Sequence, residues 1–430
     1  VLRLTASGAR EDAFWRLAEA PAEAPGPFPA RAYRRLLFQA VGDCLPGTSP
    51  VAMKLSGGLD SSSVAVVADQ ILADRGAAAP RVVGWTAERH IDDPTGELPW
   101  ARRLTRGSGI QVRPIYADAT ASSDHRCRDP HDVGATADRG AAMALPRPQP
   151  VAEARPILQR RLLAHASAGG PRVLLTGQGG DLLLSPEPTF FPRLVVRGRW
   201  VAAAAAVLAA RRPLGRWPPL YLRSWAQARW RRRPWARGQR PPGFPTWLTR
   251  EAVAAHGLEE MWRATMAGTG ARGTGGCHRP HFAHFADPAF WQAVAEYEDP
   301  AAVGIPMVAR HPLLEPRLLA LARDLPPVPW CVDKFLARRA MTGLLPDALR
   351  TRPKARGTPQ AAAITLSEAQ RSLVAAPWLV QEGFVDGPGL EKLAAAYAAG
   401  EVSAAAFQAV TAVVSFEEWR ASTLRAVAAG

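Results

Sequence analysis

The chain has 430 residues, 47% of them apolar and 21% charged, which is typical of a globular protein of about two to three domains, and it holds no apolar run long enough to span a membrane. Its formal net charge of +15 favours an acidic partner, such as a nucleotide, an acidic peptide, a nucleic acid or a membrane surface. The four cysteines are scattered without a CxxC pair, so we expect a reducing, cytoplasmic environment and no disulfide framework.

The first half of the chain alternates between strand and helix patterns. Residues 1–30 are rich in Ala and Pro without periodicity and predict a linker. The expected strands are 51–55, 81–86, 110–115 and 172–176, and the expected helices are 31–41, 59–75, 97–106 and 152–168. This rhythm predicts an α/β fold with a parallel sheet flanked by helices, and the residues after about 251 predict mostly helix.

A glycine-containing octet, Ser56-Gly57-Gly58-Leu59-Asp60-Ser61-Ser62-Ser63, follows the first strand and opens into a helix. The glycines allow main-chain N–H groups to approach an anion, and the serine hydroxyls add donors at the positive end of the helix dipole. A carboxylate beside phosphates requires a cation between them, so Asp60 predicts Mg²⁺. The octet therefore predicts an ATP site.

A second turn, Thr176-Gly177-Gln178-Gly179-Gly180-Asp181, follows the strand at 172–176. Ligands of parallel sheets collect at the carboxyl ends of the strands, so both turns are expected to face one site. Two carboxylates, Asp60 and Asp181, can then hold one hard cation over a polyphosphate.

At these residues the chain resembles the pyrophosphate-loop ATPases, and among them the asparagine synthetase-like synthetases. Two later segments add to the resemblance. Lys334, within D-K-F-L-A-R-R-A, and the stretch 343–354 (G-L-L-P-D-A-L-R-T-R-P-K) resemble the family's late lysine helix and its R-x-K tail. The stretch 310–315, Arg-His-Pro-Leu-Leu-Glu, resembles the box that precedes that helix, and the resemblance covers about residues 31–360.

The resemblance implies a ligase that adenylates a carboxylate, releases pyrophosphate and lets an amine attack. Lys334 would be the catalytic lysine, and Asp60 with Asp181 would bind Mg²⁺. ATP and its pyrophosphate would be bound by the two turns, through Ser56, Gly57, Gly58, Asp60, Ser61 and Ser62 of the first and Gly177, Gln178, Gly179 and Gly180 of the second.

Two departures from the family pattern limit which nucleophile can be expected to attack the activated carboxylate. Gln178 stands where asparagine synthetases carry an acidic residue, and an amide cannot act as a base. The family's N-terminal glutaminase-like domain has no counterpart here, so residues 1–30 are expected to be a linker or a remnant of it. Ammonia from glutamine is therefore not the expected nucleophile.

Residues 193–250 form an insertion with 14 Arg, six Trp and no acidic residue. Such an insertion resembles the macrolactam synthetases of lasso peptide biosynthesis, which join an Asp or Glu side chain of a precursor peptide to its N-terminal amine. Arginines suit carboxylates and tryptophans suit an apolar peptide surface. The resemblance implies a precursor peptide as substrate, a leader-binding protein and a leader peptidase as partners, and no membrane partner. A basic, solvated helical arm is the alternative interpretation of the insertion.

The expected organisation is thus 1–30, an ATP-binding core at 31–192, the insertion at 193–250 and a helical remainder of the synthetase at 251–430. Other functions stay open: a related ligase of a small carboxylic acid, an RNA-modifying enzyme, for which no RNA-binding module is recognisable, or a non-catalytic scaffold. Two local patterns are weaker. Cys277, His278, His281 and His284 have compact spacing for zinc, and Tyr297-Glu298 could relay a proton, although position alone supports neither.

Overall fold

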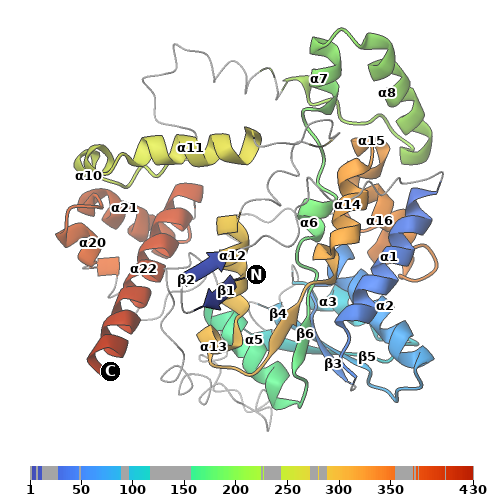
Figure 1. The fold of residues 1–430 in the computed structure, drawn as a ribbon, viewed down its shortest axis with the longest axis horizontal. Coiled ribbons are helices and arrows are strands. Elements are labelled where there is room, and N and C mark those ends of the chain that lie inside the picture. The colour runs from blue at the N-terminus through green and yellow to red at the C-terminus, as the bar shows by residue number, and fades with distance from the viewer. Residues whose placement is uncertain are drawn as a thin grey trace.

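The fold is given by a computed structural model, which describes residues 2–5, 8–11, 28–47, 50–88, 96–116, 156–223, 226, 244–271, 279, 288–353, 371, 374–375, 377–401 and 403–429. It is an α/β structure built around one parallel sheet with helices on both faces (Figure 1). The predicted fold class is confirmed.

The sheet has five strands in the order β5-β4-β3-β6-β7, and every neighbouring pair is parallel. The strands are β3 (Val51–Lys54), β4 (Val82–Glu88), β5 (Ile110–Tyr116), β6 (Val173–Leu175) and β7 (Val308–Arg310). Because β3 and β6 are hydrogen-bonded neighbours, the two glycine turns that follow them emerge side by side at the same edge.

Alternate residues of the strands contribute to two different cores, one on each face of the sheet. Val51 and Met53 of β3 belong to the larger core, together with α1 (Pro29–Cys44) and α2 (Leu59–Asp74). Ala52 points to the smaller core, where it packs with α5 (Pro156–Ala168) and α13 (Pro300–Val303). This period-two alternation of buried side chains on both faces is what a parallel sheet covered by helices requires.

The elements around the sheet follow the predicted order, and the structure adds three short strands that the sequence did not indicate. The predicted helix at 97–106 is a single turn, α3 (Leu98–Ala101), continued by η1 (Arg102–Leu104). β7 lies in the segment predicted as helical and adds a fifth strand to the sheet. Within 1–30, β1 (Leu2–Thr5) and β2 (Gly8–Glu11) form an antiparallel pair.

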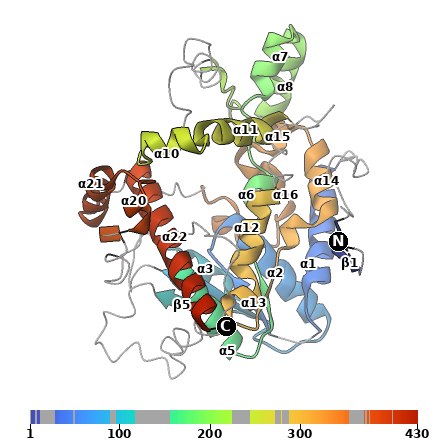
Figure 2. The same ribbon diagram turned by 60° about the vertical axis from the view of Figure 1, so that its left-hand side comes forward.

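Two helices of the insertion, α7 (Phe190–Val196) and α8 (Trp200–Leu214), project from the body of the protein in both views (Figures 1 and 2). They are followed by α10 (Arg250–Ala255), α11 (Leu258–Ala271) and α12 (Pro288–Glu298). No helix among the described residues is both long and apolar enough to cross a membrane.

After β6 the chain forms α6 (Gly180–Leu183) at the second glycine turn. The last third of the chain returns to the sheet and adds η6 (Pro312–Leu314), α14 (Pro316–Asp324), α15 (Pro327–Trp330), η7 (Val332–Lys334), α16 (Phe335–Ala340) and α17 (Asp347–Arg350). Three further helices, α20 (Trp378–Gln381), α21 (Gly387–Ala398) and α22 (Ala404–Ala429), enclose a third core. Trp247 and Leu248, at the end of the insertion, pack against that core.

Candidate active site

The first glycine turn is organised by its own serines. The hydroxyls of Ser56 and Ser61 lie 3.0 Å apart, and Ser61 Oγ also accepts a hydrogen bond of 3.2 Å from the Ser56 backbone N–H. Gly58 N–H donates to Ser56 Oγ, and α2 begins at the next residue. The turn therefore presents hydroxyls and backbone N–H groups at the positive end of a 16-residue helix.

The second turn packs directly against the first, and two of its positions have no room for a side chain. A Cβ at Gly177 would lie 2.7 Å from the backbone nitrogen of Ser61, and one at Gly180 would lie 2.6 Å from Asp60 Oδ2. These contacts are shorter than real Cβ atoms make. The glycines of the second motif therefore allow the two turns to touch.

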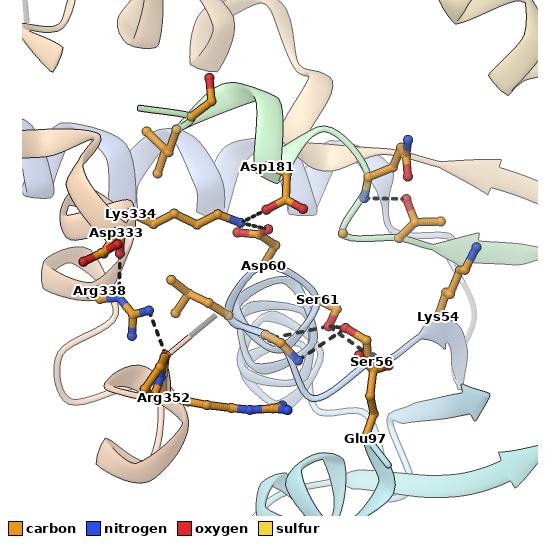
Figure 3. Close-up of a pocket in the computed structure, with 18 of the residues that line it drawn as sticks. Lys54, Ser56, Asp60, Ser61, Glu97, Asp181, Asp333, Lys334, Arg338 and Arg352 are labelled. Atoms are coloured by element: carbon orange, nitrogen blue, oxygen red, sulfur yellow. Dashed lines mark hydrogen bonds and ion pairs between the residues drawn. The ribbon is translucent and has the colours of Figure 1, made fainter. Parts of the chain in front are cut away.

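Lys334 joins the two turns through their carboxylates. Its Nζ lies 2.6 Å from Asp181 Oδ1 and also pairs with Asp60 Oδ2 (Figure 3). Burial lowers the pKa of Lys334, but the charges and hydrogen bonds of Asp60 and Asp181 outweigh it, so the pKa is raised above the ordinary lysine value. The lysine is therefore held in its charged form at neutral pH.

The pair Asp60 and Asp181 fits a magnesium ion. Both carboxylates face one point, and the Lys334 ammonium occupies that point as a monovalent cation. Carboxylate oxygens are the ligands that Mg²⁺ prefers, and it usually takes one or two of them together with substrate phosphates. A magnesium ion bound there would displace the lysine from between the two acids.

These groups line a cavity of about 410 Å³ at the carboxyl edge of the sheet. It contains most of the predicted site: Ser56, Gly58, Asp60, Ser61, Gly177, Gln178, Asp181 and Lys334. Gly57, Ser62, Gly179 and Gly180 do not line it. Ser62 is fully buried, and its hydroxyl has no hydrogen-bond partner among the described residues.

Further cationic residues add to the lining, among them Arg338 of the segment around Lys334 and Arg352 of the R-x-K tail. Arg338 and Arg352 border the cavity next to Lys334, and Lys54 at the end of β3 lies across from them (Figure 3). Arg352 donates to the carbonyl of Gly57 at 3.1 Å and stacks on Trp100, 4.4 Å from the ring centre. Burial lowers the pKa of Arg338 and of Arg352, but a guanidinium stays protonated. The lining thus combines four cationic side chains with five acidic ones, Asp60, Glu97, Asp181, Glu298 and Asp333, and the cations can contact a polyanion.

The backbone that carries the lysine is strained. Asp333 and Lys334 have φ values of 48° and 56°, in the left-handed region that side chains other than glycine rarely adopt. Arg338 Nε donates to the Asp333 carbonyl at 2.7 Å, and Arg216, at the end of α8, pairs with the Asp333 carboxylate. The left-handed turn directs the lysine side chain to the two acids and links it to the insertion.

The box at 310–315 has an identifiable structural role at each end. Arg310 donates to the Cys44 carbonyl at 2.9 Å. Glu315 caps α14 by accepting from the backbone N–H groups of Arg317 and Leu318. Between them, His311 contacts Thr176 and Glu298, and Glu298 lines the cavity. The cysteine and histidines of the weak zinc pattern, and Lys354 of the R-x-K tail, lie outside the described residues.

Two adjoining glycine turns at neighbouring parallel strands, with two acids and a lysine between them, define a nucleotide-binding α/β protein that acts on a polyphosphate. The chain belongs to the asparagine synthase family, whose profile, described as Asparagine synthase, matches residues 32–421. It is accordingly an ATP-dependent, amide-forming ligase, and the family ordinarily uses ATP with Mg²⁺. No curated protein matches the chain.

Proposed function

We propose that this protein adenylates an Asp or Glu side-chain carboxylate of a precursor peptide and closes a macrolactam with the peptide's N-terminal amine, as in lasso peptide biosynthesis. The carboxylate oxygen would attack the α-phosphorus of ATP, and the α–β anhydride bond would break to release pyrophosphate. The amine would then attack the acyl carbon, the acyl–phosphate bond would break to release AMP, and the nitrogen would lose a proton. The peptide loses one water overall.

The observation that carries the adenylation step is the meeting of Asp60, Asp181 and Lys334 in one cavity, which Arg338 and Arg352 also line. Asp60 and Asp181 would hold Mg²⁺, which would supply positive charge to the pyrophosphate leaving group. The two turns would bind the phosphates through backbone N–H groups and the Ser56 and Ser61 hydroxyls. Lys334, released from the acids, would stabilise the charge that develops at the reacting centre, a contribution of about 3 kcal/mol for one well-placed donor.

The peptide substrate is supported by the described part of the insertion. Trp200, Val201 and Trp217 are more than half exposed, and Arg211 lies 4.4 Å from the centre of the Trp217 ring. Arginine and tryptophan together favour an acidic peptide with apolar side chains. The pair between Arg216 and Asp333 connects this surface to the residue before Lys334. A leader-binding protein and a leader peptidase would deliver the peptide.

The test is to incubate the protein with ATP, Mg²⁺, precursor peptide and the two delivery proteins. A cyclic product lighter by one water, formed with AMP and pyrophosphate, supports the proposal, whereas ADP contradicts it. Asp60→Ala and Asp181→Ala should each abolish turnover, and Asp74→Ala, an exposed acid at the other end of α2, should not. Trp217→Ala should raise KM for the peptide but not for ATP, and Leu424→Ala, an exposed apolar residue of α22, should change neither.

A further inference from the structure

A chain of hydrogen-bonding groups leads from the second glycine turn to the wall of the cavity. The backbone N–H of Gln178 donates to Thr176 Oγ1 at 3.1 Å. Thr176 Oγ1 lies 2.7 Å from His311 Nδ1, and His311 Nε2 lies 3.1 Å from Glu298 Oε2. Thr176 and His311 directly follow the neighbouring strands β6 and β7, and Glu298 is the last residue of α12, so the fold brings the three side chains together.

The first contact of this chain has a defined direction, because Thr176 Oγ1 accepts from the Gln178 backbone N–H. Between Thr176 Oγ1 and His311 Nδ1 either group can donate, since a hydroxyl both donates and accepts and the ring has two tautomers. The contacts thus place the imidazole between Thr176 on one nitrogen and Glu298 on the other.

Two of these groups are buried, since Thr176 is 2% exposed and Glu298 is 8% exposed. A buried carboxylate is costly without a nearby cation, and His311 Nε2, 3.1 Å from Glu298 Oε2, forms an ion pair with it when the imidazole is protonated. Glu298 also reaches the cavity that contains Ser56, Asp60 and Lys334. The carboxyl group therefore contacts His311 and borders the reaction space.

We propose that Glu298 accepts the proton released when the amine attacks the acyl adenylate, and that His311 is the positioning residue that holds Glu298 for this step. The inference rests on the proposed function. As the new C–N bond forms, the N–H bond of the attacking amine breaks and its proton passes to a Glu298 oxygen. The electron pair of the acyl–phosphate bond leaves with AMP. Gln178, an amide, cannot take this proton, and Asp60 and Asp181 are committed to the cation.

The experiment separates adenylation from amide formation. A precursor peptide with an acetylated N-terminus can be adenylated but cannot cyclise. Exchange of labelled pyrophosphate into ATP with that peptide therefore reports the first step. Hydroxylamine, added as an external nucleophile, reports the amount of acyl adenylate as a hydroxamate. Cyclic product from the unblocked peptide reports both steps together.

Glu298→Gln should lower cyclic product at least about a hundredfold, the range of one general base, while exchange and hydroxamate fall by less than about threefold. His311→Gln should lower the kcat for cyclisation by about tenfold with KM for ATP and for peptide unchanged, and His311→Asn, with a shorter side chain, should lower it further. Glu417→Gln removes an equally buried carboxylate in α22, where it accepts from Leu379 N–H. It should leave all three measurements unchanged and serves as the control for loss of a buried acid.

Two results would overturn the inference: equal losses of exchange and product in Glu298→Gln, or unchanged cyclisation in that variant. Equal losses in a variant whose thermal unfolding matches the wild type would mean that Glu298 acts before amide formation. A wild-type protein without exchange or hydroxamate would overturn the proposed function itself. The two failures are therefore distinguishable.

Discussion

Lys334 Nζ lies 2.6 Å from Asp181 Oδ1 and pairs with Asp60 on its other side. The lysine therefore occupies the point between the two acids that the fold otherwise offers to a divalent cation. Lysine and Mg²⁺ cannot both occupy it. A metal held by both acids would release the ammonium from this point, and under the proposed function the lysine would then be available to the phosphates.

This competition predicts the effect of Lys334→Met on metal binding. Without the ammonium, the two carboxylates repel each other and should bind Mn²⁺, a spectroscopic substitute for Mg²⁺, on the order of tenfold more tightly in the absence of ATP. The measurement is the amplitude of the free Mn²⁺ signal by electron paramagnetic resonance. Lys392→Met, at an exposed position of α21, should bind Mn²⁺ like the wild type. Equal or weaker binding by Lys334→Met would contradict the competition.

The contact between the turns predicts that Gly177→Ala destabilises the protein. The new methyl group would overlap the Ser61 backbone, and we expect a loss of about 1–3 kcal/mol in the free energy of unfolding, with turnover reduced further because Ser61 must move. Urea denaturation measures the first effect. Gly47→Ala is the matched control, since a Cβ there meets no atom within 4 Å. Similar stabilities for the two variants would mean that the turns can separate at little cost.

The contacts of Arg352 predict that it contributes more to ATP use than Arg103, which stacks on the same tryptophan. Arg352 and Arg103 both stack on Trp100, at 4.4 and 4.3 Å, but only Arg352 also donates to Gly57 in the first turn. A lysine cannot both stack and reach the carbonyl in the same way. Arg352→Lys should lower kcat/KM for ATP about tenfold, equivalent to about 1.4 kcal/mol, and Arg103→Lys by less than about threefold. The kcat/KM of each variant is measured from steady-state pyrophosphate release. Equal losses in the two variants would mean that stacking on Trp100, and not the hydrogen bond to Gly57, accounts for the effect.

The left-handed turn predicts which substitutions Asp333 tolerates. A β-branched residue is disfavoured at a φ of 48°, so Asp333→Val should cost about 1–3 kcal/mol of folding free energy. Asparagine tolerates this conformation, and Asp333→Asn should cost less than about 1 kcal/mol, the usual value of an exposed ion pair such as the one with Arg216. Thermal unfolding monitored by circular dichroism compares them. Equal losses would show that the backbone conformation is not retained in the variants.

The sequence predicted the parts of the site that depend on local chemistry. Two strands followed by glycine turns had to meet at one edge of a parallel sheet, and the structure places Asp60 and Asp181 there with Lys334. Their predicted roles in binding ATP and Mg²⁺ stay predictions.

The parts that could not be predicted depend on long-range packing. β7 has only three residues, too few for a periodic pattern, so the fifth strand was missed. Arg338 and Arg352 lie in the segments that carry the family resemblance, but neither could be placed at the cavity from a chain with 53 Lys and Arg in total. The sequence analysis named Glu298 as a possible proton relay, but its position alone did not support that role. Only the folded chain brings His311, which contacts Thr176, next to it.

The pairing of Thr176 with His311 joins residues 135 positions apart. During synthesis, β3 and β6 can leave the ribosome and associate while β7, His311 and Lys334 are still absent. The two acids of the turns would then face each other without their lysine, and the edge of β6 would stay open to other chains. The insertion, with 14 arginines and no acidic residue, is made during this interval, so the nascent chain carries its most basic segment before its binding cavity is complete.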